Sequence, residues 1–381
     1  MDFALSDEQE AIFDMARAFG AEHIAPHAQA WEEARTIPRD LWTKAAELGF
    51  GGLYVSEDHG GTGLSRLDGT LVFEALAMSC PSVAAFLSIH NMCGGMIEKF
   101  GSEDSKARWL PGLCAMTTIF SYCLTEPGSG SDAAALRTRA ERTNDGWRLN
   151  GTKAFISGGG YSDAYICMVR SGQDGPKGIS SVVVENGTPG LSFGALERKM
   201  GWKSQPTSQV QFDDCLIPTE NLLGDEGRGF SYAMAGLDGG RLNISACALG
   251  GAQAALDATL RYMGERRAFG QSLDQFQALQ FRLAEMETAL QSSRIFLRQA
   301  AWKLDHGAPD ASKFCAMAKL HVTDRAFEVA NQCLQLHGGY GYLADYGIEK
   351  LVRDLRVHQI LEGTNEIMRL IISRALLAER G

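Results

Sequence analysis

The order of helical and β-type sequence patterns limits the possible folds of this 381-residue chain more than any single motif. Amphipathic helical spacing extends to about residue 118 and returns from about residue 230. Between these regions lie short alternating or β-branched runs, and six of the ten prolines lie in the segment from Pro111 to Pro218. We therefore expect an α+β multidomain protein. It would comprise an N-terminal helical domain (1–118), a middle antiparallel β-barrel or sandwich (119–225) and a C-terminal four-helix-bundle-like domain (226–381).

The expected helices show apolar residues at three- and four-residue spacing, and Ser6 with Gln9 forms a capping-box pattern before the first of them. They cover residues 8–22, 38–48, 67–78, 242–266, 273–306, 312–335 and 348–381. The expected strands cover residues 117–124, 136–142, 147–149, 153–157, 164–170, 179–185 and 209–212.

Charge and hydropathy exclude some partners. The net charge is −10 and no dense basic run occurs, which argues against nucleic acid as the main partner. No apolar stretch approaches the roughly 20 residues of a membrane span. The acidic start resembles neither a signal peptide nor a transit peptide, and the nine scattered cysteines form no C-x-x-C pair. We expect reduced thiols, no zinc or iron–sulfur site, and a bacterial cytoplasm, with the mitochondrial matrix as the alternative for a processed form.

A glycine- and serine-rich segment, residues 124–132, follows an expected strand. Its glycines would let a ligand approach the backbone, and its hydroxyls suit a phosphate or a flat polar ring. Gly128, Gly130 and Ala133 also fit the dinucleotide pattern G-x-G-x-x-A. More alternating strand follows instead of a helix, so we reject a Rossmann unit. A simple turn in a β domain remains an equal alternative.

Two other segments are rich in glycine. Gly158 to Gly160 follow Phe155-Ile156-Ser157 and are expected to form a hairpin loop. Residues 335–342 hold more glycine than a helix end requires, which suits either a backbone cradle for a pyrophosphate or an interhelix turn. Arg266 ends an expected helix, where its charge favours the helix dipole. The sequence contains no H-E-x-x-H, P-loop or G-x-S-x-G motif.

Glu362 stands between the apolar pair Ile360-Leu361 and the break Gly363-Thr364. If the carboxylate faces a closed pocket, burial would raise its pKa toward the range of a general base. The local sequence by itself favours a simpler interpretation, in which Gly363-Thr364 is a turn and helix N-cap with Glu362 solvated beside it.

Considered together, these segments resemble the acyl-CoA dehydrogenase family over essentially the whole chain. The resemblance lies in residues 123–133, in residues 335–341 followed by Asp345, Lys350 and Asp354, and in Glu362-Gly363-Thr364. Residues 201–207, 335–342 and 356–363 resemble the branch of the family that acts on isobutyryl-CoA.

The resemblance implies FAD, a homotetramer built as a dimer of dimers, and α,β-dehydrogenation of a short branched acyl-CoA. The expected reaction is conversion of isobutyryl-CoA to methacrylyl-CoA in valine catabolism, with butyryl-CoA or 2-methylbutyryl-CoA as alternative substrates. By analogy Glu362 removes the α-proton, the β-hydrogen passes to the flavin as hydride, and an electron-transferring flavoprotein accepts the electrons. An acyl-CoA oxidase and a non-catalytic acyl-CoA-binding protein are the competing hypotheses.

The resemblance also assigns site residues. Those implied to contact FAD are Tyr122, Cys123, Leu124, Thr125, Gly130, Ser131, Phe155, Ile156, Ser157, Arg266, Phe269, Phe276, Gln277, Gln335, Leu336, His337, Gly338, Gly339, Thr364, Asn365 and Glu366. Those implied to contact the substrate are Ser131, Asp238, Gly239, Gly240, Arg241, Gly363 and Arg374. In some relatives the base precedes the arginine that matches Arg241. Gly240 occupies that position here, which leaves Glu362 as the expected base.

Overall fold

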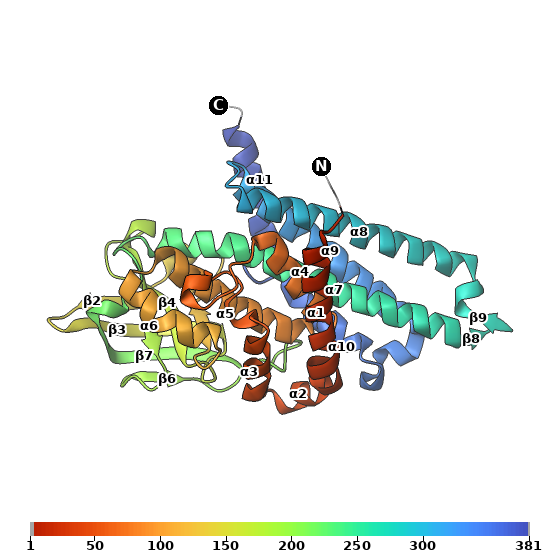
Figure 1. Ribbon diagram of the computed structural model, residues 1–381, viewed down its shortest axis with the longest axis horizontal. Coiled ribbons are helices and arrows are strands. Elements are labelled where there is room, and N and C mark those ends of the chain that lie inside the picture. Colours follow the sequence, from red (N-terminus) through yellow and green to blue (C-terminus); the bar gives the residue numbers. More distant parts are fainter. Residues whose placement is uncertain (1–3, 380–381) are drawn as a thin grey trace.

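Helices from both ends of the chain pack together, and a curled β-sheet lies at one end of the helical body (Figure 1). The computed structural model describes residues 4–379. The long helix α7 (Gly229–Glu265) runs from the sheet toward the opposite end of the molecule and packs against helices of both regions. This arrangement confirms the expected order of helical, β and helical regions.

In the N-terminal region, the three helices that the hydrophobic spacing predicts begin within one residue of their expected starts, and three further helices match no expected range. Ser6 caps α1 with both hydrogen bonds of a capping box, as expected, and a π-helical turn at Gly20–Ile24 extends it. Buried α5 begins with Pro81 at its first turn, a position that needs no backbone donor. The helices of this region are α1 (Asp7–Phe19), α2 (Ala28–Ala34), α3 (Arg39–Glu47), α4 (Arg66–Ala77), α5 (Pro81–Phe100) and α6 (Glu103–Cys114).

The middle region forms one seven-stranded sheet in the order β1-β4-β2-β3-β7-β6, with β5 paired to β4. Its strands are β1 (Phe120–Cys123), β2 (Arg139–Arg142), β3 (Gly146–Ser157), β4 (Ala164–Arg170), β5 (Ile179–Glu185), β6 (Leu191–Phe193) and β7 (Thr207–Pro218). Four pairs are antiparallel, as expected, whereas β1 and β2 each pair with β4 in parallel.

Two local expectations for the sheet are wrong. Residues 147–149 and 153–157 belong to one strand, β3, whose pairing with β7 shifts register twice. Gly158 to Gly160 form no hairpin, because they connect β3 to β4 and these strands are not neighbours. A side chain at Gly158 would stand 2.3 Å from the hydroxyl oxygens of Ser121 and Ser162, so glycine is required by this close approach.

The C-terminal helices pack in a bundle around α7 and α9. They are α7, α8 (Gln277–Asp305), α9 (Ala311–Leu336), α10 (Ile348–Arg356) and α11 (Asn365–Ala378), and a two-strand hairpin, β8 (Arg267–Ala268) and β9 (Gln271–Ser272), joins α7 to α8. One hydrophobic core continues from Ala16 of α1 to Leu355 of α10 and so joins both helical regions. The domain limits drawn from the sequence remain predictions.

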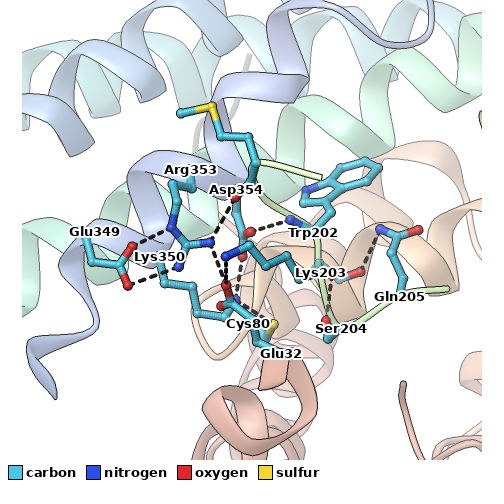
Figure 2. Close-up of polar contacts among 12 residues, drawn as sticks. Glu32, Cys80, Trp202, Lys203, Ser204, Gln205, Glu349, Lys350, Arg353 and Asp354 are labelled. Atoms are coloured by element: carbon cyan, nitrogen blue, oxygen red, sulfur yellow. Dashed lines mark hydrogen bonds and ion pairs between the residues drawn. The ribbon is translucent and has the colours of Figure 1, made fainter. Parts of the chain in front are cut away.

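A buried ionic cluster connects three distant segments, as Figure 2 shows. Glu32 of α2 forms ion pairs with Arg353 and Lys350 of α10 and with Lys203, which precedes β7. Asp354 accepts a hydrogen bond from the backbone N–H of Trp202 at 2.6 Å and pairs with Lys350. Each buried charge therefore has a partner, which is the condition for tolerating it in the interior.

Within residues 4–379, none of the helices has the length and apolar character required to cross a membrane.

Candidate active site

Glu362 lies in a sharply turned loop between a 3₁₀ turn at Val357–Gln359 and helix α11. Its φ is +52° and that of Gly363 is +91°, so two consecutive residues adopt the left-handed conformation. This conformation is uncommon for a residue with a side chain and marks functional loops when the surroundings enforce it. Thr364 caps α11 by accepting a hydrogen bond from the N–H of Ile367 at 3.3 Å, which confirms the predicted N-cap.

The carboxylate of Glu362 is not solvated, so the simpler interpretation of the local sequence is wrong. The residue as a whole is half-buried, but its Oε2 atom is buried and lacks a hydrogen-bond partner among residues 4–379. Burial raises the pKa of this carboxyl to about 7, against the opposing charges of Lys319 and Arg241. A Cβ atom at Gly240 would stand 2.5 Å from Oε2. The absent side chain at residue 240 therefore provides the space for the carboxylate.

A second buried polar group lies near Glu362. The hydroxyl of Tyr122 has no hydrogen-bond partner in the described part of the chain. Burial raises the pKa of Tyr122 well above its usual value, and the neighbouring Cys93 and Glu362 raise it further. Two unpaired polar groups in one buried region are costly, which makes this region a candidate for contact with a ligand.

Of the α7 residues expected to contact substrate, Gly240 and Arg241 lie beside Glu362. Buried Arg241 donates to Asp238 at 2.6 Å, and its Nε lies 3.4 Å from the carbonyl oxygen of Glu362. At Gly239 a Cβ would meet the guanidinium of Arg66 at 2.5 Å. Ser131 and Arg374 are exposed, on the loop after β1 and on α11, and so lie at the surface rather than in this buried group.

The segment 124–138 is fixed from within by Glu126, whose structural role the sequence analysis did not identify. Its carboxylate accepts hydrogen bonds from the N–H groups of Arg137 (2.6 Å) and Thr138 (2.9 Å) and from the buried ammonium group of Lys153 (2.7 Å). These partners lower the pKa of Glu126 although burial opposes them. Around Gly128 and Gly130 the space is open. A 3₁₀ turn and β2 follow, consistent with rejection of a Rossmann unit.

Phe155 is the most exposed aromatic residue of the sheet. It is 69% exposed and has a φ of +58°, at the point where β3 shifts register against β7. A bulky aromatic side chain in the left-handed conformation and exposed to solvent is unfavourable unless it serves a site. The N–H of Ala154 donates to the carbonyl of Thr125 at 2.8 Å. The predicted residues 122–131 and 155–157 are therefore neighbours.

A pocket of about 560 Å³ lies at the other end of the helical bundle, around the C-terminal end of α9. There His337 stacks on Tyr262 at 4.4 Å, and Arg266 lies 5.2 Å from the ring of Tyr340. Gly338 and Gly339 have open space around them. The lining includes Arg266 and residues 335–340, so the predicted glycine cradle and its arginine come together. Leu336 is among these lining residues and is largely buried.

The remaining predicted cofactor residues lie in different surroundings. Phe269 of the β8–β9 hairpin is 96% exposed with a φ of +52°, and its ring packs edge-on against Phe276, just before Gln277. Asn365, in contrast, is buried and its side chain is fully used by Lys319, Thr323 and Asp324. It is therefore an internal anchor of the loop, and Glu366 beside it is exposed.

Most of the predicted cofactor residues form two groups at opposite ends of the molecule, whereas Thr364, Asn365 and Glu366 lie at the start of α11. Figure 1 shows the sheet that carries Phe155 at one end and the β8–β9 hairpin at the other. A single chain thus holds these two groups of residues far apart. The buried carboxylate with a pKa near 7 belongs to the end of α7 near the sheet and is suited to accept a proton from a weak carbon acid.

Family comparisons cover nearly the whole chain. Residues 6–117 match the N-terminal domain of acyl-CoA dehydrogenases, residues 121–215 the middle domain, and residues 227–377 the C-terminal domain. The isobutyryl-CoA dehydrogenase of Bos taurus, a mitochondrial protein, is 54% identical over 375 residues, which are 98% of this chain and 90% of the bovine one.

Solved structures share the fold. Butyryl-CoA dehydrogenase from Megasphaera elsdenii is 37% identical with a TM-score of 0.96, and the alignment covers 99% of this chain and 100% of that one. A chain from the structure of the electron transferring flavoprotein of Acidaminococcus fermentans has the same TM-score and coverage at 41% identity. The FAD complex of PigA, 32% identical with both chains covered in full, gives a TM-score of 0.95.

Proposed function

Because the chain belongs to the acyl-CoA dehydrogenase family, we propose that it oxidises isobutyryl-CoA to methacrylyl-CoA, with Glu362 as the general base. As a member of this family the chain is an oxidoreductase acting on acyl-CoA, and FAD is its cofactor. The observation that carries the role of Glu362 is its buried, unpaired carboxylate beside Gly240. The bovine relative named for isobutyryl-CoA supports the choice of substrate.

The proposed chemistry begins at the α-carbon of the thioester. An α-proton is very weakly acidic, so its removal needs a base active near neutral pH and donors for the charge that develops on the thioester oxygen. Glu362 supplies the base, with a pKa of about 7. Its own backbone N–H has no acceptor among residues 4–379 and can donate to that oxygen. In this proposal one residue thus provides both the base and a donor.

The residues present fit FAD. When bound, FAD supplies the acceptor for the β-hydrogen and its two electrons. Exposed Phe155 and the open loop at Gly128 and Gly130 suit the flat ring system, and the open glycines 338 and 339 with Arg266 suit a pyrophosphate. Leu361, beside Glu362, packs against the hydrophobic core, and such apolar surroundings would help to keep water from the reacting carbon.

Separation of these two groups supports the proposed homotetramer, a dimer of dimers. One chain holds the two groups at opposite ends (Figure 1). For one FAD to contact both, one of the groups would have to come from a neighbouring copy of the chain. Exposed apolar side chains on α8 and α11 offer surface for such contacts, among them Phe281, Ile295, Leu376 and Leu377. Analytical ultracentrifugation tests this proposal, and a monomer that retains FAD would contradict it.

We propose an electron-transferring flavoprotein as the electron acceptor, which the fold shared with the Acidaminococcus fermentans chain supports. The alternative is an oxidase that passes electrons to oxygen. Turnover measured with each acceptor separates them, and faster reoxidation by oxygen would overturn the proposal. The bacterial cytoplasm stays our prediction for the compartment, with the mitochondrial matrix, the location in the bovine relative's name, as the alternative.

The substrate is tested by anaerobic bleaching of the flavin absorbance. Isobutyryl-CoA, 2-methylbutyryl-CoA and butyryl-CoA are mixed separately with the FAD-loaded protein. Since one methylene or branch changes selectivity by about 1–3 kcal/mol, we expect isobutyryl-CoA to bleach about tenfold or more faster than the others. A higher rate with butyryl-CoA would contradict the substrate, and no bleaching by any thioester would contradict the function.

A further inference from the structure

Lys319 of α9 is a fully buried cation with only neutral hydrogen-bond partners. Its ammonium group donates to the carbonyl of Gly363 at 2.8 Å and to Oδ1 of Asn365 at 2.8 Å. Within residues 4–379 no carboxylate lies close enough to form an ion pair with it. A buried charge without a direct counter-ion is expensive, and a structural role would be served by a neutral donor at lower cost.

The two groups that Lys319 holds are the residues that follow the proposed base. Gly363, with its left-handed φ, is adjacent to Glu362, and Asn365 is the first residue of α11. Thr323 and Asp324, one turn further along the same face of α9, accept hydrogen bonds from Asn365 at 3.0 and 2.7 Å. Asp324 also accepts from Gln359 at 2.7 Å, on the other side of the loop. Helix α9 thus fixes both ends of the loop that carries Glu362.

Lys319 also acts on the charge of Glu362. Its positive charge lowers the pKa of that carboxyl, more than Arg241 does, although burial keeps the value near 7. In return, the pKa of Lys319 is lowered to about 8 by burial while Glu362 raises it, so the ammonium stays charged at neutral pH. The two groups therefore influence each other through their charges without forming a direct ion pair.

We propose that Lys319 is a positioning residue for the base: it clamps the loop at Gly363 and Asn365, and its charge favours the ionised form of Glu362. This inference rests on the proposed role of Glu362. Other titratable groups also face this region and are kept unchanged in the test. Around Glu362 they are Arg241 and Cys247 of α7 and Tyr122 of β1, and around Lys319 they are Asp324, His358 and Glu366.

The test is the pH dependence of flavin bleaching by isobutyryl-CoA in Lys319→Met, Lys319→Gln and Lys319→Arg, between pH 5.5 and 7.5. In this range Lys319 is charged, since its pKa is about 8. The rate rises with pH as Glu362 ionises. Without the cation the midpoint of this rise should move up by about one pH unit, and the rate well below the midpoint should fall about tenfold. Lys319→Arg should keep the original midpoint.

Lys319→Gln separates charge from clamping, because its amide can still donate to the carbonyl of Gly363. The proposal would be overturned if the midpoint of the pH dependence were the same as in the wild type in both the Gln and the Met variants. It would also be overturned if the Gln variant alone kept the wild-type midpoint, since the charge would then not be required. If Lys319→Met fails to fold, as judged by its melting temperature and FAD absorbance, the Gln and Arg variants carry the test. Lys313→Met is the matched control, since this lysine lies on the same helix and pairs with exposed Glu379. Absence of bleaching in the wild type would refute the proposed function instead.

Discussion

A Cβ atom added to Gly240 of α7 would stand 2.5 Å from the carboxylate oxygen of Glu362, in a loop 122 residues further along the chain. The glycine and the carboxylate thus share one small space. Because Gly240 has no side chain, the surface of helix α7 leaves space for the carboxylate of Glu362, which the loop before α11 carries. This contact limits the position of the proposed base.

Gly240→Ala should slow flavin bleaching by isobutyryl-CoA by about tenfold or more without unfolding the protein. The added methyl would meet the end of a flexible side chain rather than backbone, so the carboxylate shifts and the fold persists. Removing a helical glycine also favours the helix by roughly 0.5–1 kcal/mol. Gly264→Ala, near the end of α7, is the control, because its Cβ would have no neighbour closer than 3.9 Å. Equal rates in both variants would contradict the shared space.

Burial of Glu362 predicts a pH-dependent cost in stability. The pKa of its carboxyl is about 7 in the folded protein and 4.5 in its ordinary state. Between these values the folded state binds more protons than the unfolded state, so the contribution of this group to stability falls as the pH rises from about 4.5 to 7. As the pH rises from 5 to 8, the melting temperature of Glu362→Gln should therefore increase relative to that of the wild type. A constant difference would show that the carboxylate is solvated.

Lys153→Met should destabilise the protein by about 3–5 kcal/mol, because it leaves the buried carboxylate of Glu126 without its cation. The same variant should release the segment after β1 and weaken FAD binding. Denaturant unfolding and the retained flavin absorbance measure the two effects. Lys106→Met is the control, since this lysine pairs with exposed Glu103 and such pairs contribute about 0–1 kcal/mol. Similar losses in both variants would refute the role of the buried pair.

The sequence predicted the order of the regions and most helices, because amphipathic spacing reports which face is buried. It did not predict α5, whose apolar and small residues occur on all sides, since a fully buried helix has no polar face. It placed the start of α7 thirteen residues late (242 instead of 229), as the glycines at 236, 239 and 240 obscure the helical pattern. The parallel pairs of β4 also escaped prediction, because strand neighbours depend on topology and not on local sequence.

The candidate site was predictable where a motif carries it and not where it depends on distant contacts. Residues 122–131, 155–157 and 335–339 could be assigned through the family resemblance, and their proximity within each group agrees with that assignment. The environment of Glu362 could not be derived from its neighbours in sequence, which favour a solvated turn. Lys319 and Lys153 were missed because an isolated lysine in a helix or strand carries no sequence signal for burial.

Anaerobic flavin bleaching in Glu362→Gln tests the central claim most directly. The variant removes the base but retains the size of the side chain, so FAD absorbance and acyl-CoA binding should persist. Exposed Glu328→Gln on α9 serves as the control. Loss of a general base predicts that bleaching by isobutyryl-CoA slows by about 100-fold or more in Glu362→Gln and stays unchanged in the control. Bleaching of Glu362→Gln at the wild-type rate would contradict the account.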